Sequence, residues 1–295
     1  MVNQHLQPEG REIATLARKL DEVSVAVCVL NRENDIAACL ESVRACQPAE
    51  VYVIDGGSTD STQAIARRYT ENVIVDPEHS GLGAARNLAA RLAHTRYLAY
   101  VDSDVTLPPT TLAQLLADLR KHQYAGVHAQ IIAKNASTYW EWAQDQHFKL
   151  TFNRAGPRNA IGAVTALYDR QSLMEENFDS TCSGAEDGEI SYRLSRRGYR
   201  LGVSEAVCYH RHRATFEAFI RQRIWYGKGT WAFFRKHRNP RMLLAALAFG
   251  PLGAAWVVLK GKPLLIPYML AHGLFFSVGV FVAALNLNVN HSAKH

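Results

Sequence analysis

The chain has 295 residues, of which 48% are hydrophobic and 20% are charged. A chain of this length and apolar content can bury a substantial core as one large domain or two smaller ones, which argues against a disordered protein. Its five cysteines are odd in number and show no C-x-x-C spacing. Reduced thiols are therefore expected, rather than a zinc site or a disulfide framework.

The formal net charge of +6 is unevenly distributed. Between Arg193 and Arg241, thirteen Lys and Arg residues stand against only Glu205 and Glu217. Such a segment could contact nucleic acid, anionic lipid headgroups or a phosphorylated substrate, and composition alone does not choose among them. The apolar tail that follows the segment favours a membrane, so we expect no nucleic-acid partner.

Residues 1–22 predict an N-terminal helical extension. Ile13, Leu16, Ala17 and Leu20 recur at helical spacing. The stretch lacks a continuous apolar core, so we do not expect it to be a secretory signal.

From residue 23 onward, strand and helix patterns alternate. Strands are predicted at 23–30, 51–54, 72–75, 97–101, 126–132 and 160–168, and helices at 36–43, 63–69, 82–92, 112–119 and from 186. Strands that alternate with helices of about ten residues imply right-handed crossovers and a mostly parallel sheet. The predicted fold class is therefore α/β.

Polar residues follow the ends of three of these strands. They are Asn31, Glu33, Asp55, Asp102 and Asp104. Because the carboxyl ends of parallel strands meet at one edge of a sheet, these residues are expected at the edge where open α/β sheets bind ligands. Asp55 could accept a hydrogen bond from a base or a ribose, and the glycines after it allow close approach of the backbone.

Asp102 and Asp104 stand one residue apart in a D-x-D pattern, directly after a buried-strand pattern. A hard divalent cation is held by one or two protein carboxylates and completed by water and substrate phosphates. The pair therefore indicates a metal ion and a phosphorylated substrate. The alternative is that both residues only shape a turn, since Asp is a common turn residue.

A second acidic group opens the helix predicted after residue 185. Glu186, Asp187 and Glu189 lie in its first turn, where the helix dipole favours negative charge. Adjacent acids beside glycines also offer a general base, whose carboxylate can take a proton from an incoming hydroxyl.

Six elements in this order resemble the family 2 glycosyltransferases, whose nucleotide-sugar-binding, Rossmann-like fold is called GT-A. They are Asn31–Glu33, Asp55–Asp60, Gly83–Asn87, Asp102–Asp104, Glu186–Asp187 and Arg221–Gly227. The resemblance implies a GT-A domain over residues 23–240. It also implies inverting transfer of a sugar from a nucleoside diphosphate sugar to an acceptor hydroxyl.

The resemblance further implies where the nucleotide binds. Asn31, Glu33 and Asp55 would hold the nucleoside, and Arg86 would help to position it. Asp102 would contact the ribose or a metal-bound water.

The same resemblance implies a cofactor and a catalytic base. Asp104, with Asp102, would bind Mg²⁺ or Mn²⁺ on the diphosphate, and His210 lies where many GT-A enzymes place a histidine near the metal. A purely structural role for His210 is the alternative. Asp187 would be the base that activates the acceptor.

Four more residues are candidate contacts for the diphosphate or the acceptor. They are Glu186, Arg221, Arg223 and Trp225. The two arginines could instead simply cover a helix face. Residues 222–225 lack the Q-x-x-R-W spacing of processive polysaccharide synthases in this family, which favours transfer of a single sugar.

The C-terminal residues 241–295 predict a membrane-associated helical hairpin and tail. The stretches 242–259 and 264–285 contain no Lys, Arg, Asp or Glu, and each approaches the ~20 residues that cross a bilayer as a helix. Pro251 and Pro267 interrupt them, so a re-entrant or interfacial pair and a buried soluble pair stay as alternatives. A membrane position favours a lipid-linked acceptor or another precursor of a cell-envelope glycan.

The leading prediction is a membrane-associated, metal-dependent hexosyltransferase or related enzyme. Its catalytic domain would face the cytoplasm, where nucleotide sugars are made. The alternatives are a non-catalytic nucleotide-sugar-binding scaffold at the membrane and a sugar nucleotidyltransferase. The absence of glycine from residues 31–34 disfavours the second alternative, and the intact set Asp102, Asp104 and Asp187 disfavours the first.

Overall fold

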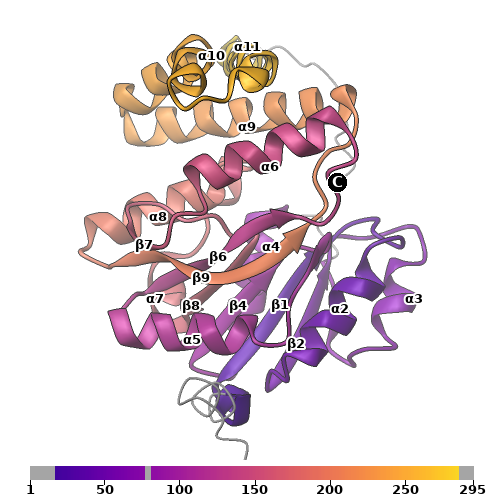
Figure 1. The fold of residues 1–295 in the computed structure, drawn as a ribbon. Coiled ribbons are helices and arrows are strands. Elements are labelled where there is room, and N and C mark those ends of the chain that lie inside the picture. Colours follow the sequence, from indigo (N-terminus) through magenta and orange to yellow (C-terminus); the bar gives the residue numbers. More distant parts are fainter. Residues whose placement is uncertain (1–16, 77–80, 286–295) are drawn as a thin grey trace, which may run out of the picture.

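The fold is organised around a twisted sheet with helices on both faces (Figure 1). The computed structural model describes residues 17–76 and 81–285. Over these residues the sheet has nine strands, in the order β3-β2-β1-β4-β8-β6-β9-β5, and β7 pairs with β9 outside this path. The strands are β1 (Val23–Val29), β2 (Glu50–Asp55), β3 (Val73–Val75), β4 (Tyr97–Val101), β5 (Val105–Thr106), β6 (Gly126–Ala133), β7 (Gly156–Arg158), β8 (Thr165–Asp169) and β9 (Leu201–His210).

The helices fall into two groups, one against the sheet and one above it (Figure 1). Those against the sheet are α2 (Ile36–Ala45), α3 (Thr62–Ala66), α4 (Leu82–Leu92), α5 (Thr111–His122), α7 (Arg170–Glu176) and α8 (Glu186–Arg196). Those above it are α6 (Tyr139–Thr151), α9 (Phe216–His237), α10 (Pro240–Leu259) and α11 (Ile266–Ala284). Three short 3₁₀ helices are η1 (Ala17–Glu22), η2 (Ser180–Cys182) and η3 (Pro263–Leu265).

The N-terminal part of the sheet is parallel, as the alternating pattern predicts. β1 lies between β2 and β4 and pairs in parallel with both, and β2 pairs in parallel with β3. Nearly every residue of β1 is buried. This is typical of a strand covered by helices on both faces, and it explains the unbroken apolar run in the sequence.

The C-terminal part of the sheet mixes directions. β8 enters between β4 and β6 and is antiparallel to both, whereas β6 and β9 are parallel. β5 and β7 add short antiparallel pairings to β9. The sequence did not predict β5, β7 or β9.

The strand predicted at 160–168 begins later than expected. Residues 160–164 form a loop, and β8 begins at Thr165. The backbone N–H groups of Ile161 and Ala163 donate to the side chains of Ser191 and Asp187 in α8, instead of to a neighbouring strand. These contacts hold the loop against α8.

One apolar cluster lies on each face of the sheet. The first includes the buried sides of α2 and α5, and the second those of α4, α7 and α8. In α2 the buried residues Ile36, Cys39, Leu40 and Val43 recur at the spacing of one helix face. All five cysteines are free thiols, as their number and spacing predicted.

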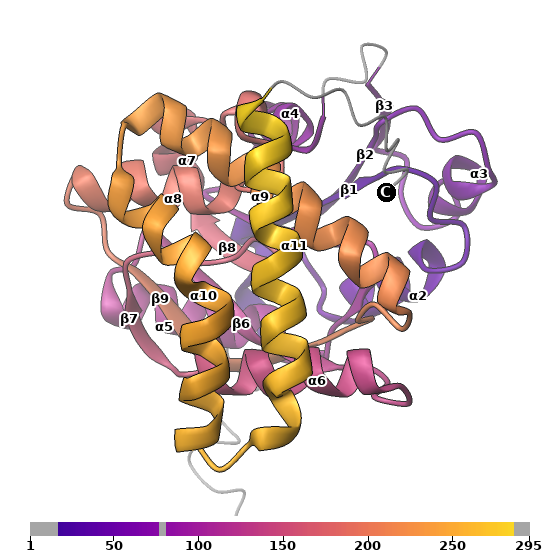
Figure 2. The same cartoon turned by 90° about the horizontal axis from the view of Figure 1, so that it is seen from above.

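A third cluster joins α6 and α9 to α10 and α11. α10 and α11 appear nearly end-on above α9 in Figure 1 and at full length across it in Figure 2. The two helices therefore lie flat over α9, and the predicted apolar helices at 242–259 and 264–285 are present. By length and composition one described helical stretch, Pro263–Ala284, could cross a membrane, which is weak evidence of membrane association.

The predicted N-terminal extension lies largely outside the described residues. The helix expected at 11–20 overlaps the described part only from Ala17, where the chain forms the 3₁₀ helix η1.

Close backbone approach fixes α11 against α9, and an alanine can test it. A Cβ added to Gly279 would overlap the carbonyl oxygen of Ile224 in α9, which cannot move without shifting that helix. We expect Gly279→Ala to lower the stability of the detergent-solubilised full chain by about 1–3 kcal/mol, measured by thermal unfolding.

Gly253→Ala is the matched control in α10. A Cβ there would lie 3.4 Å from the methyl carbon of Met269, which is ordinary van der Waals contact. Because alanine favours helix, this variant should unfold at or slightly above the temperature of the parent chain. Equal unfolding temperatures for the two variants would contradict the close contact.

Candidate active site at the carboxyl edge of the sheet

The polar residues predicted to share one sheet edge do so. β1 pairs with β2 so that Val29 lies opposite Asp55, and it pairs in parallel with β4 on its other side. Asn31, Asp55 and Asp102 therefore leave the sheet at the same edge.

Asp55 is completely buried and held in a fixed orientation. Its Oδ1 accepts the backbone N–H groups of Gly57 at 2.8 Å and Ser58 at 2.6 Å, and the Gln63 amide at 3.2 Å. Its Oδ2 has no hydrogen-bond partner among the described residues. A buried oriented acceptor without a partner is suited to a donor group of a ligand.

Asn31 and Glu33 bind the loop after β2. Asn31 donates its backbone N–H to the Ser58 hydroxyl at 2.8 Å and accepts the Thr59 N–H on its side chain at 2.9 Å. The Glu33 carboxylate accepts the Ser61 N–H at 3.0 Å. These two predicted nucleotide contacts thus join the two loops at the edge of the sheet and fix the surroundings of Asp55.

Arg86 lies between two carboxylates that are far apart in the sequence. The residue is 4% exposed, and its guanidinium lies 3.1 Å from Glu186 Oε1 and 3.5 Å from Asp102 Oδ1. The rings of Tyr100 and Phe178 lie within 5.8 Å of the guanidinium carbon. Arg86 therefore connects the end of β4 to the start of α8.

The cluster carries more negative charge than Arg86 neutralises. Burial raises the pKa of Asp102 to about 7 although 35% of its side chain is exposed; Arg86 acts in the opposite direction. The charges of Asp104, Asp187 and Glu186 raise the pKa further. Arg86 pairs with Asp102 and Glu186, and Arg213 pairs with Asp104, so these four neighbouring carboxylates face two guanidinium groups. The remaining negative charge creates a site that a cation would stabilise.

The Asp104 carboxylate lies beside a histidine and an arginine, which can donate hydrogen bonds to it. Its Oδ1 is 3.4 Å from His210 Nε2, and its Oδ2 is 3.8 Å from an Arg213 guanidinium nitrogen. Burial raises the pKa of Asp104, but His210, Arg213 and Arg32 outweigh it and leave that pKa below its ordinary value. Asp104 is therefore ionised at neutral pH, as a metal ligand must be.

His210 reaches Asp104 because β5 pairs with the end of β9, where Val105 lies opposite His210. Its Nδ1 is 2.8 Å from Nδ1 of His212, so one ring donates to the other. Burial lowers the pKa of both rings, to about 3 for His212, and both are neutral. When His210 is the donor at Nδ1, its Nε2 carries a lone pair that can bind a metal.

No three His, Cys, Asp or Glu side chains converge as a closed metal site within the described part of the chain. Mg²⁺ and similar cations are instead held by one or two carboxylates together with waters and substrate phosphates. The pair Asp102 and Asp104 fits such an open site.

Of the three acids that open α8, Asp187 is the one whose carboxylate is not engaged in an ion pair with a described residue. Its Oδ1 accepts the Gly188 N–H at 2.8 Å and its Oδ2 the Ala163 N–H at 3.4 Å. Unlike Glu186, it has no ion pair with any described residue, and it is partly exposed. An oriented, unpaired carboxylate can accept a proton from a bound hydroxyl.

The two arginines of α9 that the sequence analysis named, Arg221 and Arg223, face opposite sides of the helix. Arg221 is exposed and pairs with Glu217 at 2.5 Å, so it covers an outer helix face. Arg223 is 3% exposed and lies 5.2 Å from the centre of the Phe219 ring and 4.7 Å from that of Tyr226. Its Nε has no partner among the described residues.

Trp225 and a glycine bring α9 against the loop that precedes Asp187. A Cβ on Gly184 would lie 2.9 Å from the Trp225 carbonyl oxygen and 3.1 Å from its ring. A Cβ on Gly229 would overlap the carbonyl oxygen of Ser183. The backbone of α9 therefore packs directly on the loop that leads into Asp187.

The sequence analysis missed three residues at this site. Arg213 and His212 follow the predicted His210 in an H-R-H-R run, which was a usable signal. Tyr226 carried no such signal. Burial raises the pKa of the Tyr226 hydroxyl; the charges of Arg223 and Arg213 lower this pKa, and those of Asp187 and Asp102 raise it. Tyr226 therefore lies close to the carboxylate cluster.

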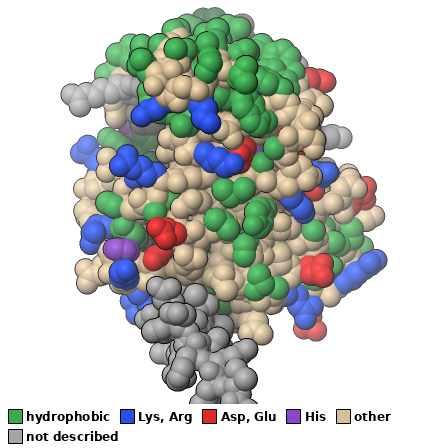
Figure 3. All heavy atoms as spheres, in the orientation of Figure 1, with side chains coloured by type: hydrophobic (Ala, Val, Ile, Leu, Met, Phe, Trp, Pro, Cys, Tyr) green, Lys and Arg blue, Asp and Glu red, His purple; other side chains and the backbone are tan. Residues whose placement is uncertain are grey.

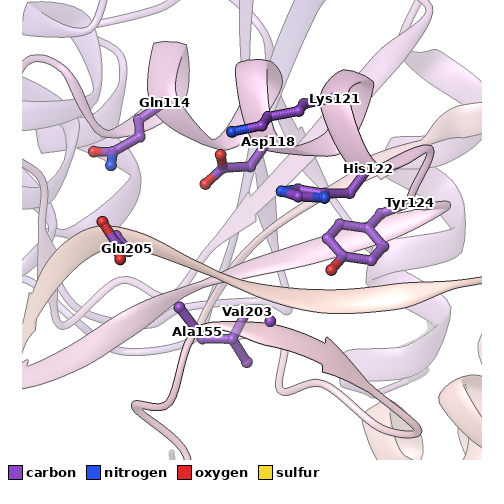
Figure 4. Close-up of a pocket in the computed structure, with 9 residues that line it drawn as sticks. Gln114, Asp118, Lys121, His122, Tyr124, Ala155, Val203 and Glu205 are labelled. Carbon is purple, nitrogen blue, oxygen red and sulfur yellow. The ribbon is translucent and has the colours of Figure 1, made fainter.

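A cavity of 230 Å³ lies elsewhere on the described surface, between α5 and β9 (Figure 4). Its lining residues are Gln114, Asp118, Lys121, His122, Tyr124, Ala155, Gly156, Val203 and Glu205. It shares no residue with the carboxylate cluster and contributes nothing to the site.

A model of the family described as glycosyl transferase family 2 matches residues 24–178, which is more than half of the chain. The chain belongs to glycosyl transferase family 2. As a member of this family, the protein is a glycosyltransferase.

Curated relatives of this glycosyltransferase agree with that assignment. The succinoglycan biosynthesis protein ExoA of Rhizobium meliloti is 29% identical over 285 residues and covers 86% of each chain. The pre-mycofactocin glycosyltransferase of Mycobacterium tuberculosis is 25% identical over 81% of this chain and 53% of the relative.

Solved structures confirm the predicted GT-A fold of the glycosyltransferase. The mannosyltransferase PcManGT of Pyrobaculum calidifontis, in complex with GDP-Man and Mn²⁺, aligns with a TM-score of 0.66 over 95% of this chain and 96% of its own, at 18% identity. GalNAc-T7 with UDP, GalNAc and Mn²⁺ aligns with a TM-score of 0.53 over 79% of this chain and 63% of its own, at 16% identity.

Removing the buried guanidinium should destabilise the whole glycosyltransferase. In Arg86→Met, Asp102 and Glu186 would lose their shared counter-ion inside the protein. Losing one partner of a buried ion pair costs about 3–5 kcal/mol. We therefore expect a lower urea midpoint with an unchanged slope.

Arg91→Met is the control, because Arg91 is exposed on the same helix. The free energy of unfolding of this variant should match that of the parent chain within about 0.5 kcal/mol, so its urea midpoint should be close to the parent midpoint. Equal midpoints for the two variants would show that Arg86 does not hold the cluster together.

Proposed function

We propose that this glycosyltransferase is inverting and metal-dependent, and that it transfers a single sugar from a nucleoside diphosphate sugar to an acceptor hydroxyl. The carrying observation is the arrangement of the carboxylates. Asp102 and Asp104 lie at the end of β4, and Arg86 and Glu186 connect them to Asp187, which has no ion pair among the described residues.

The nucleoside end of the donor would lie over Asp55, whose Oδ2 is buried without a partner among the described residues. Asn31 and Glu33 shape this end through their hydrogen bonds to the loop after β2. Arg86 is buried and engaged by carboxylates, so it would position Asp102 toward the ribose rather than contact the nucleotide itself.

Asp104, with Asp102, would hold Mg²⁺ or Mn²⁺ against the donor diphosphate. The ionised state of Asp104 and the excess negative charge of the cluster support this assignment. Neutral His210 stands beside Asp104 as a further ligand or as its hydrogen-bond donor. When bound, the cation neutralises the charge that develops on the diphosphate leaving group.

Asp187 would carry the chemical step. Its carboxylate accepts the proton of the acceptor hydroxyl while the hydroxyl oxygen bonds to the anomeric carbon. The bond from that carbon to the diphosphate oxygen breaks, and the nucleoside diphosphate leaves. Attack from the face opposite the leaving group inverts the anomeric configuration, and such a single displacement needs one base and no protein nucleophile.

The acceptor would approach from the side of α9, where Arg223 and Trp225 lie. Arg223 is a buried cation without an ion-pair partner among the described residues, which suits a phosphate-bearing acceptor. The apolar helices α10 and α11 beside it favour a lipid-linked acceptor. The printed name of the Rhizobium relative, a succinoglycan biosynthesis protein, supports a glycan or a glycan precursor.

The division of labour along the chain follows from these assignments. Residues 23–240 would form the catalytic domain and residues 241–295 the membrane-associating part. The domain would face the cytoplasm, where nucleotide sugars are made. The free thiols of all five cysteines are consistent with that side.

The proposed base can be tested once a donor is chosen from a panel. UDP-glucose, UDP-galactose, UDP-N-acetylglucosamine and GDP-mannose are first compared by thermal shift with Mn²⁺, since a ligand at 100 times its Kd stabilises a protein by about 2.7 kcal/mol. The donor with the largest shift is then incubated with a membrane lipid extract. We expect Asp187→Asn to keep the shift and to lose about 10²–10⁴-fold in turnover.

Glu205→Gln is the control, because Glu205 lines the cavity between α5 and β9, outside the carboxylate cluster, and this variant should turn over at the parent rate. Turnover by Asp187→Asn within about twofold of the parent would remove Asp187 as the base. Donor binding with no turnover in the parent chain would favour the scaffold alternative.

A further inference from the structure

The outer face of α10 and α11 is a broad apolar surface, visible as the green cap at the top of Figure 3. Its exposed large residues are Leu244, Leu252, Val258, Leu259, Leu264, Leu270, Leu274, Val278, Phe281 and Leu285. Within residues 242–259 and within residues 264–285 the sequence has no Lys, Arg, Asp or Glu. An apolar surface that covers two whole helices marks an interaction site.

The exposed residues of α11 form one stripe. Leu270, Leu274, Val278 and Phe281 recur every three or four residues, which places them on a single side of the helix. Other residues of α11, such as Tyr268 and Met269, are buried against neighbouring helices. The helix thus presents apolar side chains along one side only.

Backbone contacts hold this stripe facing away from the catalytic domain. A Cβ on Gly227 of α9 would overlap the carbonyl oxygen of Phe276, and one on Gly273 would overlap the backbone at Gly250 of α10. α9 is in turn packed on the loop before Asp187 through Gly229. The hairpin therefore has a fixed orientation relative to the active site.

The packing of α11 on α9 argues against an upright, spanning hairpin. α9 carries the exposed charges Arg221, Arg235 and Lys236. If α11 stood across a bilayer, the helix beneath it would enter the hydrocarbon with these charges, which is costly. A hairpin that lies flat keeps α9 at the level of the headgroups.

Basic residues surround the apolar surface. Lys260 and Lys262 are exposed at the turn between the two helices, and Arg235 and Arg238 are exposed at the end of α9. Figure 3 shows Lys and Arg side chains just beneath the apolar cap. Such a border attracts anionic headgroups, and it would repel a second copy of itself across a two-fold interface.

We propose that α10 and α11 lie side-on in one leaflet of an anionic bilayer, with the apolar stripe among the acyl chains and the basic border among the headgroups. This inference rests on the membrane association in the proposed function and specifies its geometry. The active site would then lie at a fixed height below the headgroups, within reach of the head of a lipid-linked acceptor.

The test places a cysteine in the turn between the helices. A side-on hairpin leaves Lys260 on the face that carries the catalytic domain, whereas a spanning hairpin moves it to the opposite face. Lys260→Cys and Lys121→Cys chains are expressed in membranes, and vesicles of both orientations are treated with a membrane-impermeant maleimide. The parent chain gives the background of its native thiols.

Lys121 is exposed on α5, so Lys121→Cys reports which membrane face carries the catalytic domain. We expect Lys260→Cys to react in vesicles of the same orientation as Lys121→Cys. Reaction of Lys260→Cys from the opposite face, or only after detergent, overturns the side-on geometry. Donor thermal shift and turnover, measured on the same chains, report on the proposed function separately.

A second experiment identifies what covers the surface. The double variant Leu252→Glu/Leu274→Glu should no longer float with vesicles of phosphatidylcholine and phosphatidylglycerol. The control is Met174→Glu, which changes an exposed apolar residue of α7 and should float like the parent chain. Unchanged flotation of the double variant together with conversion of a dimer to a monomer would assign the surface to a second copy and contradict the proposal.

Discussion

The buried guanidinium of Arg86 is the interaction on which the site depends. It lies 3.1 Å from Glu186 and 3.5 Å from Asp102, and so connects the end of a central strand with the start of α8. Without it, carboxylates from two distant parts of the chain would repel one another inside the protein. Arg86 and Arg213 pair with three of the four carboxylates, and the remaining negative charge makes the edge of the sheet suitable for a metal ion that would bind a diphosphate.

The second constraint is the close packing of α9. Gly229 lets its backbone lie on the loop before Asp187, and Gly227 lets the same helix lie against α11. The loop before Asp187, the proposed base, and the apolar hairpin therefore pack on opposite sides of one helix. With the hairpin in its proposed side-on position, this arrangement would give the active site a defined height relative to the membrane surface, as the proposed transfer to a lipid-linked acceptor requires.

Local sequence patterns were sufficient to predict the sheet edge, because each apolar strand ends at a polar residue and parallel strands end together. They were insufficient where partners are remote. Nothing near Arg86 indicates that its partner Glu186 lies 100 residues away. The 160–164 stretch looks like a strand, but its N–H groups bind α8. β9 escaped prediction because Ser204 and Glu205 interrupt its apolar pattern.

The central claim is that the carboxylate edge binds a divalent cation together with a nucleoside diphosphate. Titration of Mn²⁺ followed by electron paramagnetic resonance, with and without UDP or GDP, measures this directly. The account predicts tighter Mn²⁺ binding when one of these nucleotides is present, and a loss of at least about tenfold in affinity in Asp104→Asn. Equal Mn²⁺ affinity with and without nucleotide, unchanged in Asp104→Asn, would contradict it.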